Sequence, residues 1–171
     1  MDIRQCREGE EPFILSVIND GAESYRGVIP ADCWKEPYMD GPELAAEIQD
    51  GVVFWCAEED GKMAGVMGLQ MVEDVALVRH SYVRRASQGR GIGTALLRLL
   101  VESTDRAVLA GTWGSAKWAV AFYVRNGFTL LDNKEWGSLL KRYWKIAPRQ
   151  LETSVVLGDE RWCADRGCGR I

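Results

Sequence analysis

The stretch that decides the fold runs from residue 79 to residue 94 and reads Arg-His-Ser-Tyr-Val-Arg-Arg-Ala-Ser-Gln-Gly-Arg-Gly-Ile-Gly-Thr. It begins as a strand, turns through Gly89, Gly91 and Gly93, and opens a helix whose apolar residues recur at helical spacing from Ile92. Glycines let backbone N–H groups converge on a ligand, and a helix N-terminus adds partial positive charge. The pattern therefore predicts a site for a phosphate or pyrophosphate at this turn.

Two common nucleotide-binding motifs do not fit the turn. No Lys-Ser or Lys-Thr pair follows the last glycine, which excludes a P-loop, and the glycine spacing does not match the dinucleotide fingerprint. Arg84, Arg85 and Arg90 add cationic side chains around it. The alternative is a plain glycine-rich connection between a strand and a helix.

Periodicity along the rest of the chain predicts further strands and helices. We expect strands at residues 3–6, 52–57, 63–72, 75–83, 106–110, 128–131 and 152–157. We expect helices at residues 10–18, 43–49, from 92 onward, 115–126 and 136–146, the last one ended by Pro148. This mixed order predicts an α/β (α+β) domain around one sheet, over residues 1–160, followed by a C-terminal tail at 161–171.

Composition narrows the class of protein. The 171 residues are 47% hydrophobic and 27% charged, which is typical of a folded domain, and a net charge of -4 argues against a nucleic-acid partner. No apolar stretch approaches the roughly 18 residues of a membrane helix, and no export signal is seen at the start. The odd number of cysteines, 5, favours a reducing compartment, with Cys56 read as a small hydrophobe. We expect a soluble cytoplasmic protein with no membrane partner.

Two motifs resemble those of one family. Gln88-x-x-Gly91-x-Gly93 is similar to the Gln/Arg-x-x-Gly-x-Gly/Ala signature of the GCN5-related N-acetyltransferase (GNAT) family. Residues 119–128, with Tyr123 and Gly127-Phe128, are similar to that family's Ala-x-x-x-Tyr-x-x-x-Gly-Phe motif. The resemblance covers roughly residues 2–131. It implies a GNAT-like fold: a mixed, mostly antiparallel twisted sheet of six to seven strands, flanked by about four to five helices, with a V-shaped gap for acyl-CoA.

The resemblance also implies an activity. The chain would be an acyl-CoA-dependent N-acetyltransferase, an acyltransferase that moves the acetyl group of the co-substrate acetyl-CoA to a primary amine by direct attack in a ternary complex. Tyr82 and Val83 would flank the pantetheine arm. The pyrophosphate would be held by Gln88, Gly89, Arg90, Gly91, Ile92, Gly93 and Thr94. The alternatives are a catalytically inactive acyl-CoA-binding module or sensor, and a generic phosphate-ligand domain that prefers ATP.

Two residues are candidates for proton transfer. Tyr123 stands at the position of the family's motif tyrosine, and a phenol of pKa ~10 is protonated at neutral pH and can serve as general acid. The alternative is a core aromatic. His80 is the single histidine and lies on the strand beside the predicted acyl group, where it could accept a proton or simply be structural. Glu73 and Asp74 could act through a water, or form the polar turn before that strand.

The acceptor site is expected to depend on the aromatic-rich loop at residues 25–38 and on the segment after Asp132. Trp34 is a candidate wall of its pocket, and nearby acidic residues would suit a cationic amine: Glu23, Asp32 and Asp40. The partner would be a small-molecule or peptide amine, and an exposed C-terminal strand would allow a homodimer. Ala116 stands where the family commonly has an Asn that contacts pantetheine. Cys163 and Cys168 lack the spacing of a zinc site, so we expect no metal.

Overall fold

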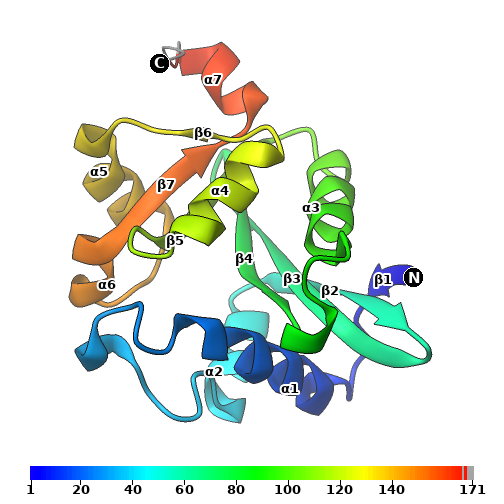
Figure 1. Cartoon of the computed structure of the whole chain (residues 1–171). Coiled ribbons are helices and arrows are strands. Elements are labelled where there is room, and N and C mark those ends of the chain that lie inside the picture. Colours follow the sequence, from blue (N-terminus) through cyan, green and yellow to red (C-terminus); the bar gives the residue numbers. More distant parts are fainter. Residues whose placement is uncertain (167, 169–171) are drawn as a thin grey trace. The chain divides into compact units, whose positions relative to one another are not determined.

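Over residues 1–166 and 168, which this computed structural model describes, the chain forms seven strands and seven α-helices. The strands belong to one sheet in the order β1-β2-β3-β4-β5-β7-β6 (Figure 1). They are β1 (Asp2–Gln5), β2 (Val52–Glu59), β3 (Lys62–Val72), β4 (Val75–Val83), β5 (Ala107–Trp113), β6 (Thr129–Leu130) and β7 (Ser154–Gly158). The helices are α1 (Glu11–Ala22), α2 (Gly41–Gln49), α3 (Ile92–Glu102), α4 (Lys117–Arg125), α5 (Asn133–Tyr143), α6 (Pro148–Thr153) and α7 (Glu160–Arg166).

The predicted α/β class and the mixed sheet of six to seven strands are confirmed. The described residues hold seven α-helices, where four to five were expected. The short helices α6 and α7, of six and seven residues, were not predicted. Elements this short show little helical periodicity in the sequence. Pro148, expected to end a helix, instead begins α6, where a proline needs no N–H partner.

Contacts within the chain define two compact units. The first holds residues 1–70 and 78–103, and the second holds residues 71–77 with the described residues from 104 on. A single domain over residues 1–160 stays a prediction.

In the first unit, β1, β2 and β3 are neighbours in the sheet, and both pairs are antiparallel. The β2–β3 hairpin closes through Asp60 and Gly61, whose φ values of +52° and +71° suit the two-residue turn that joins twisted strands. The strands expected at residues 52–57 and 63–72 thus form a hairpin. β1 pairs only with β2 and lies at one edge of the sheet.

Helices α1 and α2 pack their apolar faces on the strands of this unit. Their shared core includes Ile14, Ile18, Leu44, Phe54 and Val66. Asp40 caps α2: its carboxylate accepts from the N–H of Glu43, whose own side chain accepts from the Asp40 N–H. Asp40 was a candidate for amine binding, and this capping box accounts for its position without a substrate.

Helix α3 approaches β3 very closely at Gly65. A Cβ built there would stand 2.7 Å from Cγ2 of Ile92, the first residue of α3. Only a glycine leaves room for this packing. The contact sets where the N-terminus of α3 begins, directly after the predicted phosphate turn.

In the second unit, β7 lies between β5 and β6 and pairs antiparallel with both. All five of its residues are buried. The expectation of an exposed C-terminal strand is therefore wrong, because both edges of β7 are already hydrogen-bonded. A homodimer stays a prediction without that support.

We expected a C-terminal tail at residues 161–171, and for residues 161–166 this expectation is wrong. Residues up to Arg166 belong to α7, whose Trp162 is 2% exposed and packs edge-on against Tyr143 of α5. Gly158 lies so close to Trp162 that a Cβ would stand 2.7 Å from its ring. Residues 167 and 169–171 lie outside the described part.

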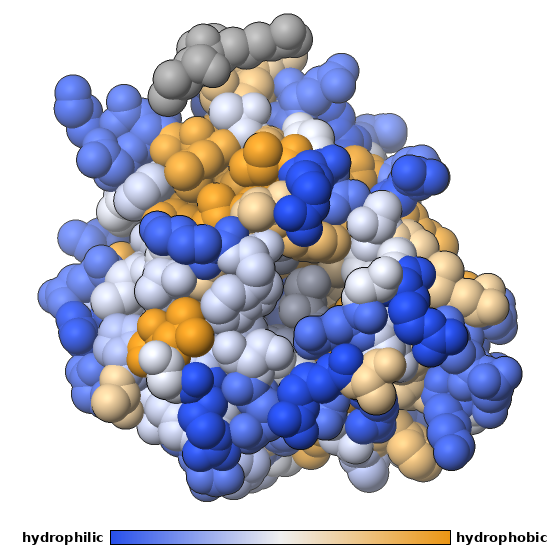
Figure 2. Space-filling model, viewed as in Figure 1, coloured by the Kyte–Doolittle hydropathy of each residue, from blue (hydrophilic) through white to orange (hydrophobic). Residues whose placement is uncertain are grey.

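The second unit also exposes some apolar side chains. Val124 of α4 and Leu130 of β6 are 49% and 40% exposed, and Figure 2 shows a hydrophobic patch over these two elements. Among the described residues, no helix is both long and apolar enough to cross a bilayer.

Candidate functional site

The predicted phosphate turn is open in the structure. After the short 3-10 helix η3 (Arg85–Ser87), Gly89 and Gly91 adopt φ values of +76° and +82°. A Cβ at either position would have no heavy atom within 4 Å. Both glycines therefore serve the backbone conformation, and the space beside them is free for a ligand.

The N-terminus of α3 opens onto this space. Gly91 is its N-cap residue and no side chain caps the helix. The N–H groups of Ile92, Gly93 and Thr94 thus have no partner within the helix, and the helix dipole places partial positive charge there. An anion with several oxygens would satisfy these donors.

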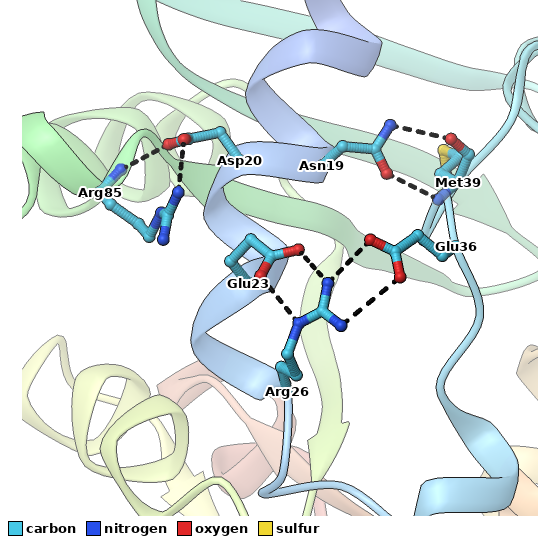
Figure 3. A network of polar contacts seen from close by, with 7 residues as sticks. All are labelled: Asn19, Asp20, Glu23, Arg26, Glu36, Met39 and Arg85. Carbon is cyan, nitrogen blue, oxygen red and sulfur yellow. Dashed lines mark hydrogen bonds and ion pairs between the residues drawn. The ribbon is translucent and has the colours of Figure 1, made fainter.

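Two arginines hold the turn in place. The Arg84 side chain donates from Nε to the Met63 carbonyl (2.8 Å) and from Nη2 to Ser16 Oγ (3.0 Å). The backbone N–H of Arg85 donates to Asp20 Oδ2 at 2.7 Å, and its guanidinium also faces that carboxylate (Figure 3). These arginines, expected around the phosphate, anchor the turn to β3 and α1.

Arg90 is the more available cation. It pairs with Glu59 at 3.0 Å, and its side chain is 58% exposed. An exposed ion pair is worth about 0–1 kcal/mol. Arg90 can therefore exchange Glu59 for a phosphate at little cost.

The end of β4 leads directly into the turn. Gln88 Nε2 donates to the Val83 carbonyl at 3.2 Å, which links the first motif residue to the strand end. Gly21 of α1 packs against the same place, because a Cβ there would stand 3.0 Å from the Val83 oxygen. The rings of Tyr25 and Tyr38 contact Tyr82 edge-on. The structure thus brings Tyr82, Val83 and Gln88 together.

β4 departs from regular strand geometry at His80, whose φ is +49°. In a regular strand, consecutive side chains point to opposite faces. Here Arg79 and His80 both reach Glu47 of α2: Arg79 Nη2 lies 2.7 Å and His80 Nε2 lies 3.0 Å from the same carboxylate oxygen. Arg79 and His80 would lie on opposite faces of a regular strand, but because of this irregularity both face α2.

The Glu47 carboxylate is the centre of a partly buried polar network. Arg79 also donates to Gln70 Oε1 at 2.6 Å, and Gln70 Nε2 donates to the Asp50 carbonyl at 2.9 Å. Burial alone would raise the pKa of Glu47, but contact with His80 and the charge of Arg79 outweigh it and hold that pKa below its ordinary value. Glu47 is therefore ionised at neutral pH.

His80 is held in a largely buried position. Its ring stacks on Phe54 with centroids 5.9 Å apart, and its side chain is 16% exposed. Its Nε2 lies within ion-pair distance of Glu47 without the angle of a hydrogen bond. A left-handed non-glycine residue costs about 1–3 kcal/mol, and such strain concentrates at functional sites.

Tyr123 belongs to the second unit, on α4. Its ring is 5% exposed and packs between Phe122 and Phe128, with centroids 5.1 Å and 5.6 Å away. The ring is thus a core aromatic, the alternative left open by the sequence. The part of its hydroxyl in proton transfer stays a prediction.

Ala116 precedes α4 as a fully buried N-cap residue, and no side chain caps that helix. The amide contact that an Asn would supply there is therefore missing.

Glu73 and Asp74 form the turn between β3 and β4. Glu73 pairs with Arg142 at 2.8 Å, and Asp74 accepts from the Tyr143 hydroxyl at 2.8 Å and from Arg166. The Tyr143 hydrogen bond lowers the pKa of Asp74. Both carboxylates thus fit the structural alternative, because they already hold α5 and α7.

Trp34 lines a pocket of about 380 Å³, together with Asn19, Glu23, Glu36, Pro37 and Tyr38. Arg26 stands over the Trp34 ring at 4.7 Å and bridges Glu23 and Glu36 (Figure 3). Asn19 holds the loop by pairing with both backbone groups of Met39. Trp34 Nε1 is buried and has no hydrogen-bond partner among the described residues.

Sequence reasoning missed Glu47, Arg79 and Gln70. Each lies in a separate element, and no local pattern marks it. The one signal was the polar pair Arg79-His80 inside an otherwise apolar strand.

Comparison with known proteins assigns the segment that contains the turn to a protein family. Residues 50–130 match the family model described as "Acetyltransferase (GNAT) domain". That segment, which includes the phosphate turn and all of α3, α4 and β6, belongs to the GNAT acetyltransferase family, as the two motifs indicated. The comparison with curated proteins gave no significant match.

Solved structures share the fold. An acetyltransferase of the GNAT family from Staphylococcus aureus has a TM-score of 0.69 at 16% identity, covering 92% of this chain and 97% of the other. The PaiA N-acetyltransferase from Thermoplasma acidophilum, solved in complex with coenzyme A, has a TM-score of 0.68 at 16% identity, with the same coverage. A ribosomal-protein-alanine N-acetyltransferase from Brucella melitensis has 0.63 at 20% identity, covering 93% and 99%.

Proposed function

We propose that this chain transfers the acetyl group of acetyl-CoA to a primary amine in a ternary complex. The observation that carries the proposal is the uncapped N-terminus of α3 behind Gly89 and Gly91, at the end of β4. It lies within the segment that matches the acetyltransferase family. The coenzyme A in the Thermoplasma complex supports the choice of ligand.

The turn would hold the diphosphate of the co-substrate. Backbone N–H groups from Gln88 to Thr94 would donate to its oxygens, and Arg90 would add charge from the exposed side. Tyr82 and Val83 would lie beside the pantetheine arm. Acetyl-CoA supplies the activated thioester.

His80 is our candidate for the group that takes the proton from the substrate ammonium. The ionised Glu47 carboxylate, 3.0 Å from Nε2, would stabilise the imidazolium that forms. Arg79 shares that carboxylate and keeps it in place. Tyr123 is our candidate for the general acid that protonates the departing thiolate.

The acceptor would enter by the Trp34 pocket. Two carboxylates, Glu23 and Glu36, line it and one guanidinium, Arg26, lies between them, which leaves one net negative charge. Such a pocket favours a cationic amine. A small-molecule or peptide amine fits this description.

The test is incubation with acetyl-CoA and a panel of primary amines, with the acetylated product and free CoA measured by mass spectrometry. A thiol reagent is unsuitable because the chain has 5 cysteines of its own. We expect product and CoA in equal amounts. Tight CoA binding with no acetylated amine would contradict the proposal and favour a CoA-binding module.

The role of His80 is tested by His80→Asn, because asparagine tolerates the left-handed backbone of this position. We expect kcat to fall at least tenfold while KM for acetyl-CoA stays within about twofold. An unchanged kcat would remove His80 from the mechanism.

A further inference from the structure

Two cysteines and a glutamate converge in the first unit, away from the phosphate turn. Cys6 follows β1, Cys56 lies in β2, and Glu10 precedes α1. Because Arg4 pairs with Cys56 across the strands, Cys6 two residues later lies on the same face. The two Sγ atoms and a Glu10 carboxylate oxygen all lie within 4.8 Å of one another.

We propose that Cys6, Glu10 and Cys56 bind one thiophilic divalent cation, Zn²⁺ or its analogue Cd²⁺. Thiolates and carboxylates are zinc ligands, and sulfur selects against magnesium and calcium. Ligand atoms about 2.0–2.3 Å from zinc stand about 3.3–3.8 Å apart in a tetrahedral site. Side-chain shifts of about 1 Å would therefore close the cluster around an ion.

The charges of the cluster favour replacement of the two thiol protons by a divalent ion. Arg4 donates to both oxygens of Glu10 (2.7 and 2.9 Å), the Arg7 N–H adds a third bond, and together they lower the pKa of Glu10 to about 2. Burial raises the pKa of both thiols, so without an ion they keep their protons.

A divalent ion that displaces two thiol protons leaves the local charge unchanged. Arg4 also pairs with Glu58, so it keeps a carboxylate partner when Glu10 turns to the ion. Binding of the ion with release of two protons therefore leaves no unpaired charge in this partly buried cluster.

The ion would tether the N-terminal segment. β1 is an edge strand paired only with β2, and α1 begins one residue after Glu10. Cys56 is fully buried and packs in the core, while Cys6 and Glu10 are partly exposed. A water molecule would supply the fourth ligand from the side of Cys6 and Glu10. The ion would link β1, the start of α1 and β2.

The experiment uses the full chain with Cys33, Cys163 and Cys168 changed to serine, which leaves Cys6 and Cys56 as its only thiols. This variant is titrated with Cd²⁺ and Zn²⁺ under a phosphine reductant. Cadmium–thiolate absorbance in the ultraviolet, competition with a chromophoric chelator, proton release and Tm are measured. We expect one ion per chain, about two protons released, and a higher Tm.

Variants in the same background complete the test. Cys6→Ser should abolish the cadmium–thiolate band of a two-sulfur site, and Glu10→Gln should weaken binding at least tenfold. Cys6 is partly exposed, so its substitution keeps the test valid if Cys56→Ala fails to fold. No bound ion, or affinity unchanged in Cys6→Ser, would overturn the proposal. Acetyl transfer is not measured, so the two proposals can fail separately.

Discussion

Replacing Gly91 by alanine separates two roles of the glycine: it allows the left-handed backbone of the turn, and it leaves space for the predicted diphosphate. Gly91 has a φ of +82°, and an alanine Cβ there would meet no atom within 4 Å. Gly61, in the β2–β3 turn, offers a matched control: its φ is +71° and its surroundings are equally open. The two substitutions share the backbone strain and differ only in their distance along the chain from the predicted anion site.

The magnitude follows from this geometry. A non-glycine residue in the left-handed region costs about 1–2 kcal/mol, and no clash adds to it at either position. Each variant should therefore lose about 1–2 kcal/mol of unfolding free energy, or roughly 2–8 °C of Tm for a chain of this size. Only Gly91→Ala places a methyl group in the ligand's space. Loss of one charge-assisted hydrogen bond, about 1.5–3 kcal/mol, weakens CoA binding roughly tenfold to a hundredfold.

Urea denaturation measures the first effect and calorimetric titration with coenzyme A the second. We expect similar stability losses in both variants and weakened CoA binding in Gly91→Ala alone. Equal CoA affinity in the two variants would refute the placement of the diphosphate at this turn.

Three further predictions concern packing, acid stability and catalysis. Gly65→Ala should destabilise the fold by about 1–3 kcal/mol, since its Cβ would stand 2.7 Å from Ile92, and in urea denaturation the same substitution should cost less in an Ile92→Ala background than in the wild type; an equal cost in both backgrounds would argue against this contact. Arg4 and the Arg7 N–H lower the pKa of Glu10 from 4.5 to about 2, so Glu10 stabilises the fold above its unfolded pKa and the benefit fades as pH falls from about 4.5 towards 2. Thermal melts should show Glu10→Gln less stable than wild type at neutral pH, with the gap narrowing in acid; a constant gap would contradict this. Tyr123→Phe, which keeps the ring packing, should lower turnover tenfold or more with little change in CoA affinity, and unchanged turnover would exclude the hydroxyl from the chemistry.

Features that depend on neighbours in the chain could be predicted from the sequence. Strand β4 has the predicted bounds 75–83, and α3 begins at the predicted residue, Ile92, directly after Gly89 and Gly91. The helix expected at residues 136–146 lies three residues earlier, as α5 (Asn133–Tyr143), and the helices that were missed are short. A six-residue helix at Pro148 and the packing of Trp162 depend on partners far away in the sequence.

The amino-acid sequence was enough to predict the glycine turn that leads into α3, because glycine spacing and helix periodicity act within one stretch of about 15 residues; that this turn binds an anion stays a prediction. It could not show that Arg79 and His80 share Glu47, since alternation along a strand predicts opposite faces and the left-handed φ of His80 reverses that rule. Nor could it show that Cys6, Glu10 and Cys56 meet. These groups are brought together by strand pairing and helix packing, which join residues up to 50 positions apart through contacts that no local pattern records.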